Sequence, residues 1–105
     1  MAQFDICLNN GPTKSAFPCL LVLQSSLFRG AERWVVIPLV PGIGFAKQDP
    51  RLSPVLKING APFLLATQSI TNVPVRQLGE VVGSARKQAE TIIAAVDWLM
   101  NRGWD

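Results

Sequence analysis

The pair Asn59-Gly60 constrains the fold of this chain most strongly. It separates two apolar segments, residues 52–58 (LSPVLKI) and 61–68 (APFLLATQ). Asn followed by Gly suits the positive φ angles of a type I′ turn, which joins two antiparallel strands through two residues. The sequence therefore predicts a β-hairpin at 52–68, and with it an antiparallel sheet.

Three earlier segments have the character of strands. Residues 3–9 alternate apolar and polar side chains with the period of two that a half-buried strand shows, whereas residues 17–24 and 34–40 are almost continuously apolar. Pro38 cannot donate a ladder hydrogen bond, so we expect an edge, a bulge or a bend at that end of its strand. Residues 72–84 are expected to be a short connecting region, such as a brief strand or a turn.

The periodicity changes at Ser84, which is a suitable helix N-cap. From there apolar residues recur at steps of three and four, and Gly103 is a suitable C-terminal stop. We predict one amphipathic helix over about 84–102, roughly five turns long, with Trp98 on the side opposite its core face. The residues expected on that core face are Ala85, Ala89, Ile92, Ile93, Val96, Leu99 and Met100.

The composition is that of one globular domain spanning residues 1–105. Hydrophobic residues make up 49% of the chain and charged residues 16%. The longest apolar run, about 17–23, is much shorter than the roughly 20 residues of a membrane span. Asp5 stands where a secretory signal would be basic or apolar, so we expect a cytoplasmic protein with Cys7 and Cys19 reduced and buried.

Several classes of chemistry lack their usual residues. The chain has no histidine and no tyrosine, so the commonest general acid-base group and neutral metal ligand are missing. Two cysteines alone cannot complete a zinc site. The Gly-x-Gly in 41–45 has no further phosphate-loop residues and is interpreted as a flexible loop. We therefore expect no enzyme, cofactor or metal. With the ten cations dispersed along the chain, we also expect no direct nucleic-acid binding.

Five segments, taken in order, resemble the CcdB toxins of bacterial toxin-antitoxin modules: QF (3–4), VLQSS (22–26), RWVVIPL (33–39), LSPVLKINGAPFLLATQSI (52–70) and VPVRQLGEVVG (73–83). The resemblance implies an SH3-like antiparallel barrel over about 1–80, a long C-terminal helix and a homodimer. It also implies a non-enzymatic toxin that binds the DNA gyrase A subunit and traps it on cleaved DNA. A CcdA-like antitoxin would neutralise it, and the complex would repress its own operon.

The family's gyrase-binding Trp-Gly-Ile terminus has no counterpart in this sequence. A gapless alignment places it at 101–103, and Trp104 and Asp105 extend beyond it. The candidate gyrase-binding residues are Trp98, Asn101, Arg102, Gly103 and Trp104. Packing in the dimer or against a loop is the alternative for Trp98, and folding back over the barrel is the alternative for Trp104.

The resemblance places antitoxin contacts in the barrel groove and neighbouring loops. Residues 41–50, which we expect to form a mobile rim, are the best candidate here. The candidate antitoxin-binding residues are Gly42, Ile43, Gly44, Phe45 and Lys47. Trp34, at the start of an apolar strand, is expected in the core or the dimer interface.

Two other functions stay open at this point. One is a MazF-like endoribonuclease, in which Arg29, Arg33, Ser25 and Ser26 would converge on RNA phosphates. The other is a family member that has lost toxicity and retains only antitoxin binding.

Overall fold

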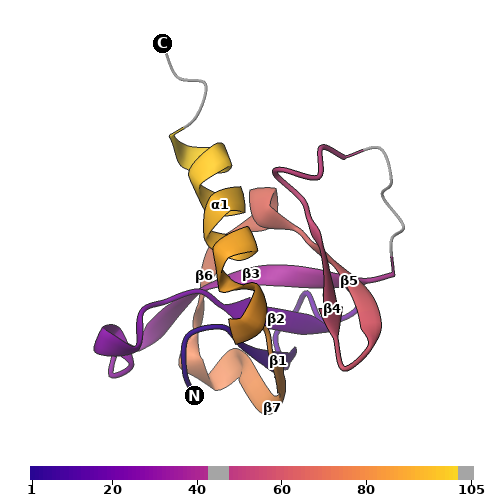
Figure 1. Cartoon of the computed structure of the whole chain (residues 1–105). Helices are drawn as coiled ribbons and strands as arrows, with labels where there is room; N and C mark the ends of the chain where they lie inside the picture. Colours follow the sequence, from indigo (N-terminus) through magenta and orange to yellow (C-terminus); the bar gives the residue numbers. More distant parts are fainter. Residues whose placement is uncertain (43–47, 102–105) are drawn as a thin grey trace.

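The described part of the protein is a seven-stranded antiparallel sheet with one C-terminal α-helix (Figure 1). The structure is a computed structural model, which describes residues 1–42 and 48–101. The prediction of a mainly-β antiparallel fold followed by a single helix is confirmed. The strands are β1 (Asp5–Asn9), β2 (Cys19–Val22), β3 (Arg33–Pro41), β4 (Val55–Ile58), β5 (Ala61–Leu65), β6 (Thr71–Pro74) and β7 (Leu78–Ser84), and the helix is α1 (Ala89–Met100).

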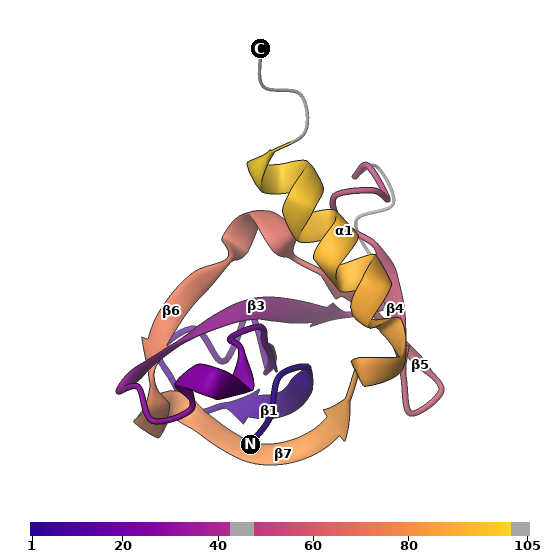
Figure 2. The ribbon, with the colours of Figure 1, turned by 60° about the vertical axis from the view of Figure 1, so that its left-hand side comes forward.

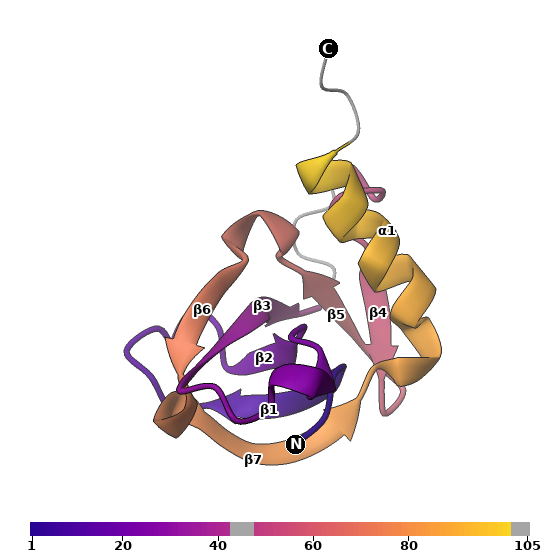
Figure 3. The same ribbon diagram turned by 90° about the vertical axis from the view of Figure 1, so that its left-hand side faces the viewer.

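The strands pair in the order β4-β5-β3-β2-β1-β7, and β6 pairs with β3 off this path. The sheet is strongly curved (Figure 3). β6 lies away from the hairpin of β4 and β5, whereas the end of β7 approaches the hairpin turn, where Asn59 donates to the Val82 carbonyl at 3.3 Å. Among the described residues β4 and β7, at the two ends of the path, do not pair with each other. The expected closure into an SH3-like barrel therefore stays a prediction.

Pro38 lies where β3 changes its partner on one side. The first half of β3 pairs with β6 through residues 33–36, and its end pairs with β5 through residues 39–41. The carbonyl of Pro38 accepts a hydrogen bond from the Ala66 N–H, 2.9 Å away. The nitrogen of a strand residue faces the same side as its carbonyl, so the missing N–H of Pro38 falls in the gap between the two ladders. The strand is interrupted here on that side, although β3 is central rather than at an edge.

The predicted hairpin is confirmed in its turn as well as in its strands. Ile58 pairs with Ala61 across the two-residue loop, and both central residues have positive φ angles, 52° at Asn59 and 81° at Gly60. This is the backbone that a type I′ turn requires.

The interpretation of 72–84 as a short connection is wrong. It contains most of β6, a 3₁₀ turn at Val75–Gln77 and all of β7. Pro74, Gly79 and Gly83 lower the local strand propensity, but β7 forms because it pairs along its length with β1. Pairing with β1, some 70 residues earlier in the chain, outweighs the low strand propensity of the segment.

The N-terminal end of the predicted helix is also wrong. Ser84 is the last residue of β7 and pairs with Asp5, and its Oγ accepts from the Arg86 N–H, so it lies too early in the chain to cap α1. A 3₁₀ turn at Arg86–Gln88 follows, and α1 begins at Ala89 with Gln88 as its N-cap. The predicted stop at Gly103 lies outside the described residues.

Apolar side chains pack on both faces of the sheet. On one face, Ile6, Leu21, Ile37 and Leu39 pack with Ile92 and Ala95 of the helix. The other face carries a second cluster of Cys7, Leu20, Val22, Trp34, Val36 and Leu78. Trp34 is 5% exposed, so its prediction as a buried residue is confirmed. Cys7 and Cys19 are unpaired as expected, with Cys7 buried and Cys19 half-buried on the opposite face of the sheet.

The contact strip of α1 is narrower than the sequence predicts. Ile92 and Ala95 are fully buried, whereas Ile93 is 48% exposed and Met100 66% exposed. The assignment of the last two to the core is wrong. The helix crosses the curved sheet obliquely (Figure 2). Only the row of side chains that contains Ile92 and Ala95 reaches the strands, and the adjacent residue Ile93 faces outward.

Candidate protein-binding site

The end of α1 carries the part of the predicted gyrase-binding segment that the structure describes. Trp98 is half-buried in the last turn, and Asn101 is an exposed residue just beyond it. The Asn101 side chain donates to the Asp97 carboxylate at 3.1 Å, and its backbone N–H donates to the Asp97 carbonyl at 2.8 Å. Arg102, Gly103 and Trp104 lie outside the described residues.

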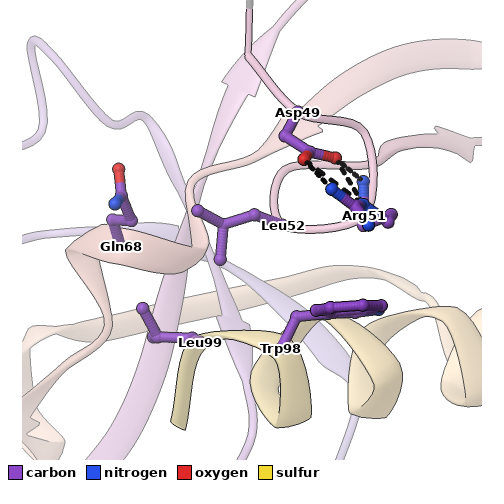
Figure 4. Close-up of a pocket in the computed structure, with 6 residues that line it drawn as sticks. All are labelled: Asp49, Arg51, Leu52, Gln68, Trp98 and Leu99. Carbon is purple, nitrogen blue, oxygen red and sulfur yellow. Dashed lines mark hydrogen bonds and ion pairs between the residues drawn. The ribbon is translucent and has the colours of Figure 1, made fainter. Parts of the chain in front are cut away.

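Trp98 packs against the segment that leads into β4, as its alternative interpretation proposed. The Arg51 guanidinium carbon lies 4.6 Å from the centre of the Trp98 ring, which is the geometry of a cation-π contact. Figure 4 shows the Arg51 side chain lying over the Trp98 ring, and both line a pocket of about 310 Å³. This pocket, the Trp98 pocket, is lined by Asp49, Arg51, Leu52, Gln68, Trp98 and Leu99.

Asp49 holds Arg51 in this position. The Arg51 Nη2 lies 2.7 Å from Asp49 Oδ2, and the backbone N–H of Arg51 donates to Oδ1 at 2.9 Å. These hydrogen bonds, the side-chain ones first, lower the pKa of Asp49 from 3.8 to about 2, and the pKa of Arg51 is raised. Both side chains are largely exposed, so the pair orients the guanidinium and adds only a little to the stability of the fold.

The residues that follow the predicted antitoxin-binding residues lie beside the helix end. Of the predicted antitoxin-binding residues, Gly42 is described, while Ile43, Gly44, Phe45 and Lys47 lie outside the described residues. Gly42 has a φ of 86°, and its N–H donates to the Pro62 carbonyl at 2.9 Å. The chain returns at residues 48–52, which lie beside the upper half of α1 (Figure 2). Asp49 and Arg51 thus connect the candidate antitoxin loop to the helix end.

Large apolar side chains outside the core add candidate anchors that sequence reasoning missed. Leu27 is 87% exposed and Phe28 63% exposed. They form the apolar tip, in the 3₁₀ turn Ser26–Phe28 between β2 and β3. Two adjacent large apolar residues between Ser25-Ser26 and Arg29-Gly30 were a usable sequence signal, since such residues seldom stand in a loop without a partner.

The outward side of α1 is apolar as well. Ile93 and Ala94 border a groove between the helix and the N-terminal segment, the helix groove. Its lining residues are Gln3, Phe4, Ala89, Glu90, Ile93, Ala94 and Asp97. Gln3 joins it to the apolar tip, because its backbone N–H donates to Ser26 Oγ at 3.2 Å and its side chain donates to the Leu23 carbonyl at 2.9 Å.

The four residues considered for an endoribonuclease are engaged in local hydrogen bonds. Ser25 Oγ accepts from the Leu27 N–H, and Ser26 Oγ accepts from Gln3. Arg29 donates to the Ser26 carbonyl, while Arg33 donates to the side chain and the carbonyl of Asn72 on β6. These contacts order the loop, with Arg33 directed toward β6.

The thiols are poor nucleophiles. Burial is the largest of the effects that raise the pKa of Cys7 to about 11, and burial also raises the pKa of Cys19. Both remain protonated near neutral pH, whereas nucleophilic attack needs the thiolate. In the described part of the chain no group of three or more His, Cys, Asp or Glu side chains could hold a metal ion. None of its helices has the length and apolar character that a membrane crossing requires.

Comparison with known protein families supplies the decisive observation. The model of the family described as CcdB protein matches residues 3–102. This chain belongs to the CcdB family. The match extends past the end of α1, so it includes the candidate antitoxin-binding residues and the candidate gyrase-binding residues up to Arg102, but not Gly103 and Trp104. Membership in the CcdB family supports a role as the toxin of a toxin-antitoxin system. No curated protein matches the chain.

Proposed function

We propose that this CcdB-family protein is the toxin of a type II toxin-antitoxin module and poisons DNA gyrase in the cytoplasm. The observation that carries the proposal is the family match over residues 3–102. The toxin acts by binding the gyrase A subunit and holding the enzyme on cleaved DNA. It needs no catalytic residue of its own, in keeping with a chain that has no histidine and with thiols that stay protonated.

The proposed gyrase-binding surface combines the helix end with the exposed apolar groups. Trp98 and Asn101 form its described part, and Arg102, Gly103 and Trp104 continue it. Binding energy at protein interfaces is concentrated in a few aromatic and arginine side chains that become buried. The Trp98 ring under Arg51 is an anchor of this kind, and Met100, 66% exposed, supplies apolar area next to it.

The proposed homodimer uses the helix groove and the apolar tip. A stable interface removes about 800 Å² of each partner from water, and exposed Ile93, Leu27 and Phe28 give this side the apolar character that such burial needs. The substitution Ile93→Asp is expected to produce monomers in sedimentation equilibrium. Val55→Asp, at another exposed apolar position, is the control and is expected to leave dimers. If both variants remained dimeric, the proposed interface would be wrong.

A CcdA-like antitoxin is proposed to neutralise the toxin through Gly42, Ile43, Gly44, Phe45 and Lys47, and the complex to repress its own operon. A disordered antitoxin segment would order on binding, which reduces affinity but adds specificity. Deletion within 43–47 is expected to weaken antitoxin binding at least tenfold in calorimetry. Unchanged affinity would remove this loop from the interface.

Growth on expression tests the toxic role directly. The full chain expressed without antitoxin is expected to arrest growth and induce the DNA-damage response, and co-expression of the antitoxin is expected to restore growth. A version truncated after Met100, which lacks 101–105, is expected to lose the arrest. Normal growth with abundant folded protein would favour the family member that retains only antitoxin binding.

A further inference from the structure

A second polar pocket lies at the opposite end of α1 from Trp98. This basic pocket has a volume of about 460 Å³ and opens between the β4–β5 hairpin, the end of β7 and the start of the helix. Its lining residues are Lys57, Asn59, Ser84, Arg86, Lys87 and Gln88. The twelve residues of α1 separate it from the proposed gyrase-binding surface by about 18 Å, so the two can be tested independently.

The basic pocket contains three cations and no carboxylate. Within the described residues the single ion pair is that of Arg51 with Asp49, so Lys57, Arg86 and Lys87 have no acidic partner there. Two acids are near in sequence or register, but both are directed elsewhere. Glu90 lines the helix groove, and Asp5, opposite Ser84 in the sheet, accepts the Ala2 N–H at 2.8 Å.

The local electrostatics disfavour this arrangement in the empty protein. The first turn of a helix carries partial positive charge, so a cation placed there is unfavourable at low salt. Arg86 and Lys87 directly precede α1 and lie beside a third cation, Lys57. Three cations that line one pocket repel one another, and the charge that would relieve this repulsion is negative.

The scaffold of the basic pocket is rigid. Gln88 donates from Nε2 to the Lys57 carbonyl and accepts at Oε1 from the Lys57 N–H, both at 3.0 Å. This reciprocal pair fixes the edge of β4 against the start of the helix. Asn59 donates to the Val82 carbonyl at 3.3 Å, which ties the hairpin turn to β7. Ser84 Oγ accepts from the Arg86 N–H, so its own proton remains to be donated to a ligand.

We propose that the basic pocket binds a phosphate group. Arg86 and Lys87 supply charge from one side, Lys57 supplies it from the hairpin, and the Ser84 hydroxyl donates to a phosphate oxygen. A tetrahedral dianion or phosphodiester accepts several such hydrogen bonds at once. The phosphate can belong to a small phosphorylated compound or to a nucleic-acid backbone, and in either case the contacts are the same.

The test is an NMR titration of the ¹⁵N-labelled full chain with inorganic phosphate, at ionic strength held constant with chloride. Saturable shifts are expected at the amides of 57 and 84–88. The variant R86Q/K87Q is expected to bind at least tenfold more weakly. Its matched control, K14Q/R76Q, removes two other exposed cations and is expected to bind within twofold of the parent. The melting temperature provides a second readout, because phosphate is expected to raise it in the parent and control but not in R86Q/K87Q.

A second titration with a short DNA duplex distinguishes the sources of phosphate. Tighter binding of the duplex through the same amides identifies a nucleic-acid backbone, whereas binding of free phosphate alone identifies a small compound. Both results support the phosphate site. Shifts that fail to saturate, that chloride reproduces, or that persist in R86Q/K87Q would overturn it. None of these outcomes depends on gyrase binding.

Discussion

Ile92 and Ile93 are identical neighbours on α1 with opposite surroundings. Ile92 is fully buried against the sheet, while Ile93 is 48% exposed beside the helix groove. The same contrast separates Trp34, 5% exposed and closed into the second apolar cluster, from Trp98, half-buried under a guanidinium at the helix end. Apolar residues in this protein therefore form two classes, one that holds the fold together and one that is available to partners.

The largest effect on the free energy of unfolding is expected when these two isoleucines are replaced one at a time. Ile92→Ala removes a fully buried side chain and leaves a cavity, so it should lower the free energy of unfolding by about 2–5 kcal/mol. Ile93→Ala should change it by less than about 1 kcal/mol, since surface substitutions have small effects. Urea unfolding measures both at a protein concentration low enough for the protomers to be dissociated, because dimerisation would add to the loss at Ile93. Equal losses would show that the outer side of α1 is as important for the fold as its buried strip.

A smaller effect is expected where the helix is fastened to the hairpin. Gln88→Ala removes both hydrogen bonds to Lys57 and should lower the free energy of unfolding by about 1–2 kcal/mol. Gln68→Ala, an exposed glutamine in the Trp98 pocket, is the control and should change it by less than about 0.5 kcal/mol. Amide hydrogen exchange in β4 should accelerate in the first variant only. Unchanged exchange in Gln88→Ala would show that Gln88 does not fix the edge of β4 to the helix.

One substitution should stabilise the protein. The Thr67 hydroxyl is buried with no hydrogen-bond partner among the described residues. Thr67→Val keeps the shape and removes the unsatisfied group, so it should raise the free energy of unfolding by roughly 1 kcal/mol. Thr71→Val, at an exposed position, should not. A loss of stability in Thr67→Val would mean that the hydroxyl has a partner in solution.

The smallest expected effect concerns the ion pair above Trp98. The folded pKa of Asp49, about 2, lies below its ordinary value of 3.8. The stabilisation it provides is therefore complete above pH 3.8 and is lost as the pH falls through 2. Arg51→Ala should raise the Asp49 pKa toward 3.8 and alter Trp98 fluorescence, whereas Arg76→Ala should do neither. NMR titration of the Asp49 carboxyl measures the shift, and an unchanged pKa would contradict the pairing.

The sequence allowed most of the sheet to be predicted, because its signals are local. Asn59-Gly60 determines a turn through its own backbone preferences, and the β-branched run around Val35 determines a strand. β7 was missed because its two glycines lower the local strand propensity. Its hydrogen-bonded pairing with β1 stabilises the strand in spite of them. The helix start was missed for the same reason, since Ser84 has the chemistry of a cap but is held in the sheet by Asp5.

The candidate site could be predicted only in part. The periodicity of α1 correctly placed Trp98 off the core face, but it also assigned Ile93 and Met100 to the core. A helical wheel gives the direction in which each side chain points, but it does not give the width of the sheet surface that the helix contacts. The contact between Arg51 and Trp98 joins residues 47 positions apart, and no pattern along the chain indicates it.

The most direct test of the central claim is a gyrase cleavage assay with the purified protein and supercoiled DNA. The parent protein, well above its dimerisation constant, is expected to accumulate linear DNA after denaturation of the enzyme. Trp98→Ala is expected to weaken this effect at least tenfold, while Val55→Ala should retain it. Failure of the folded, dimeric parent protein to trap cleaved DNA at any concentration would contradict the assignment of gyrase as its target.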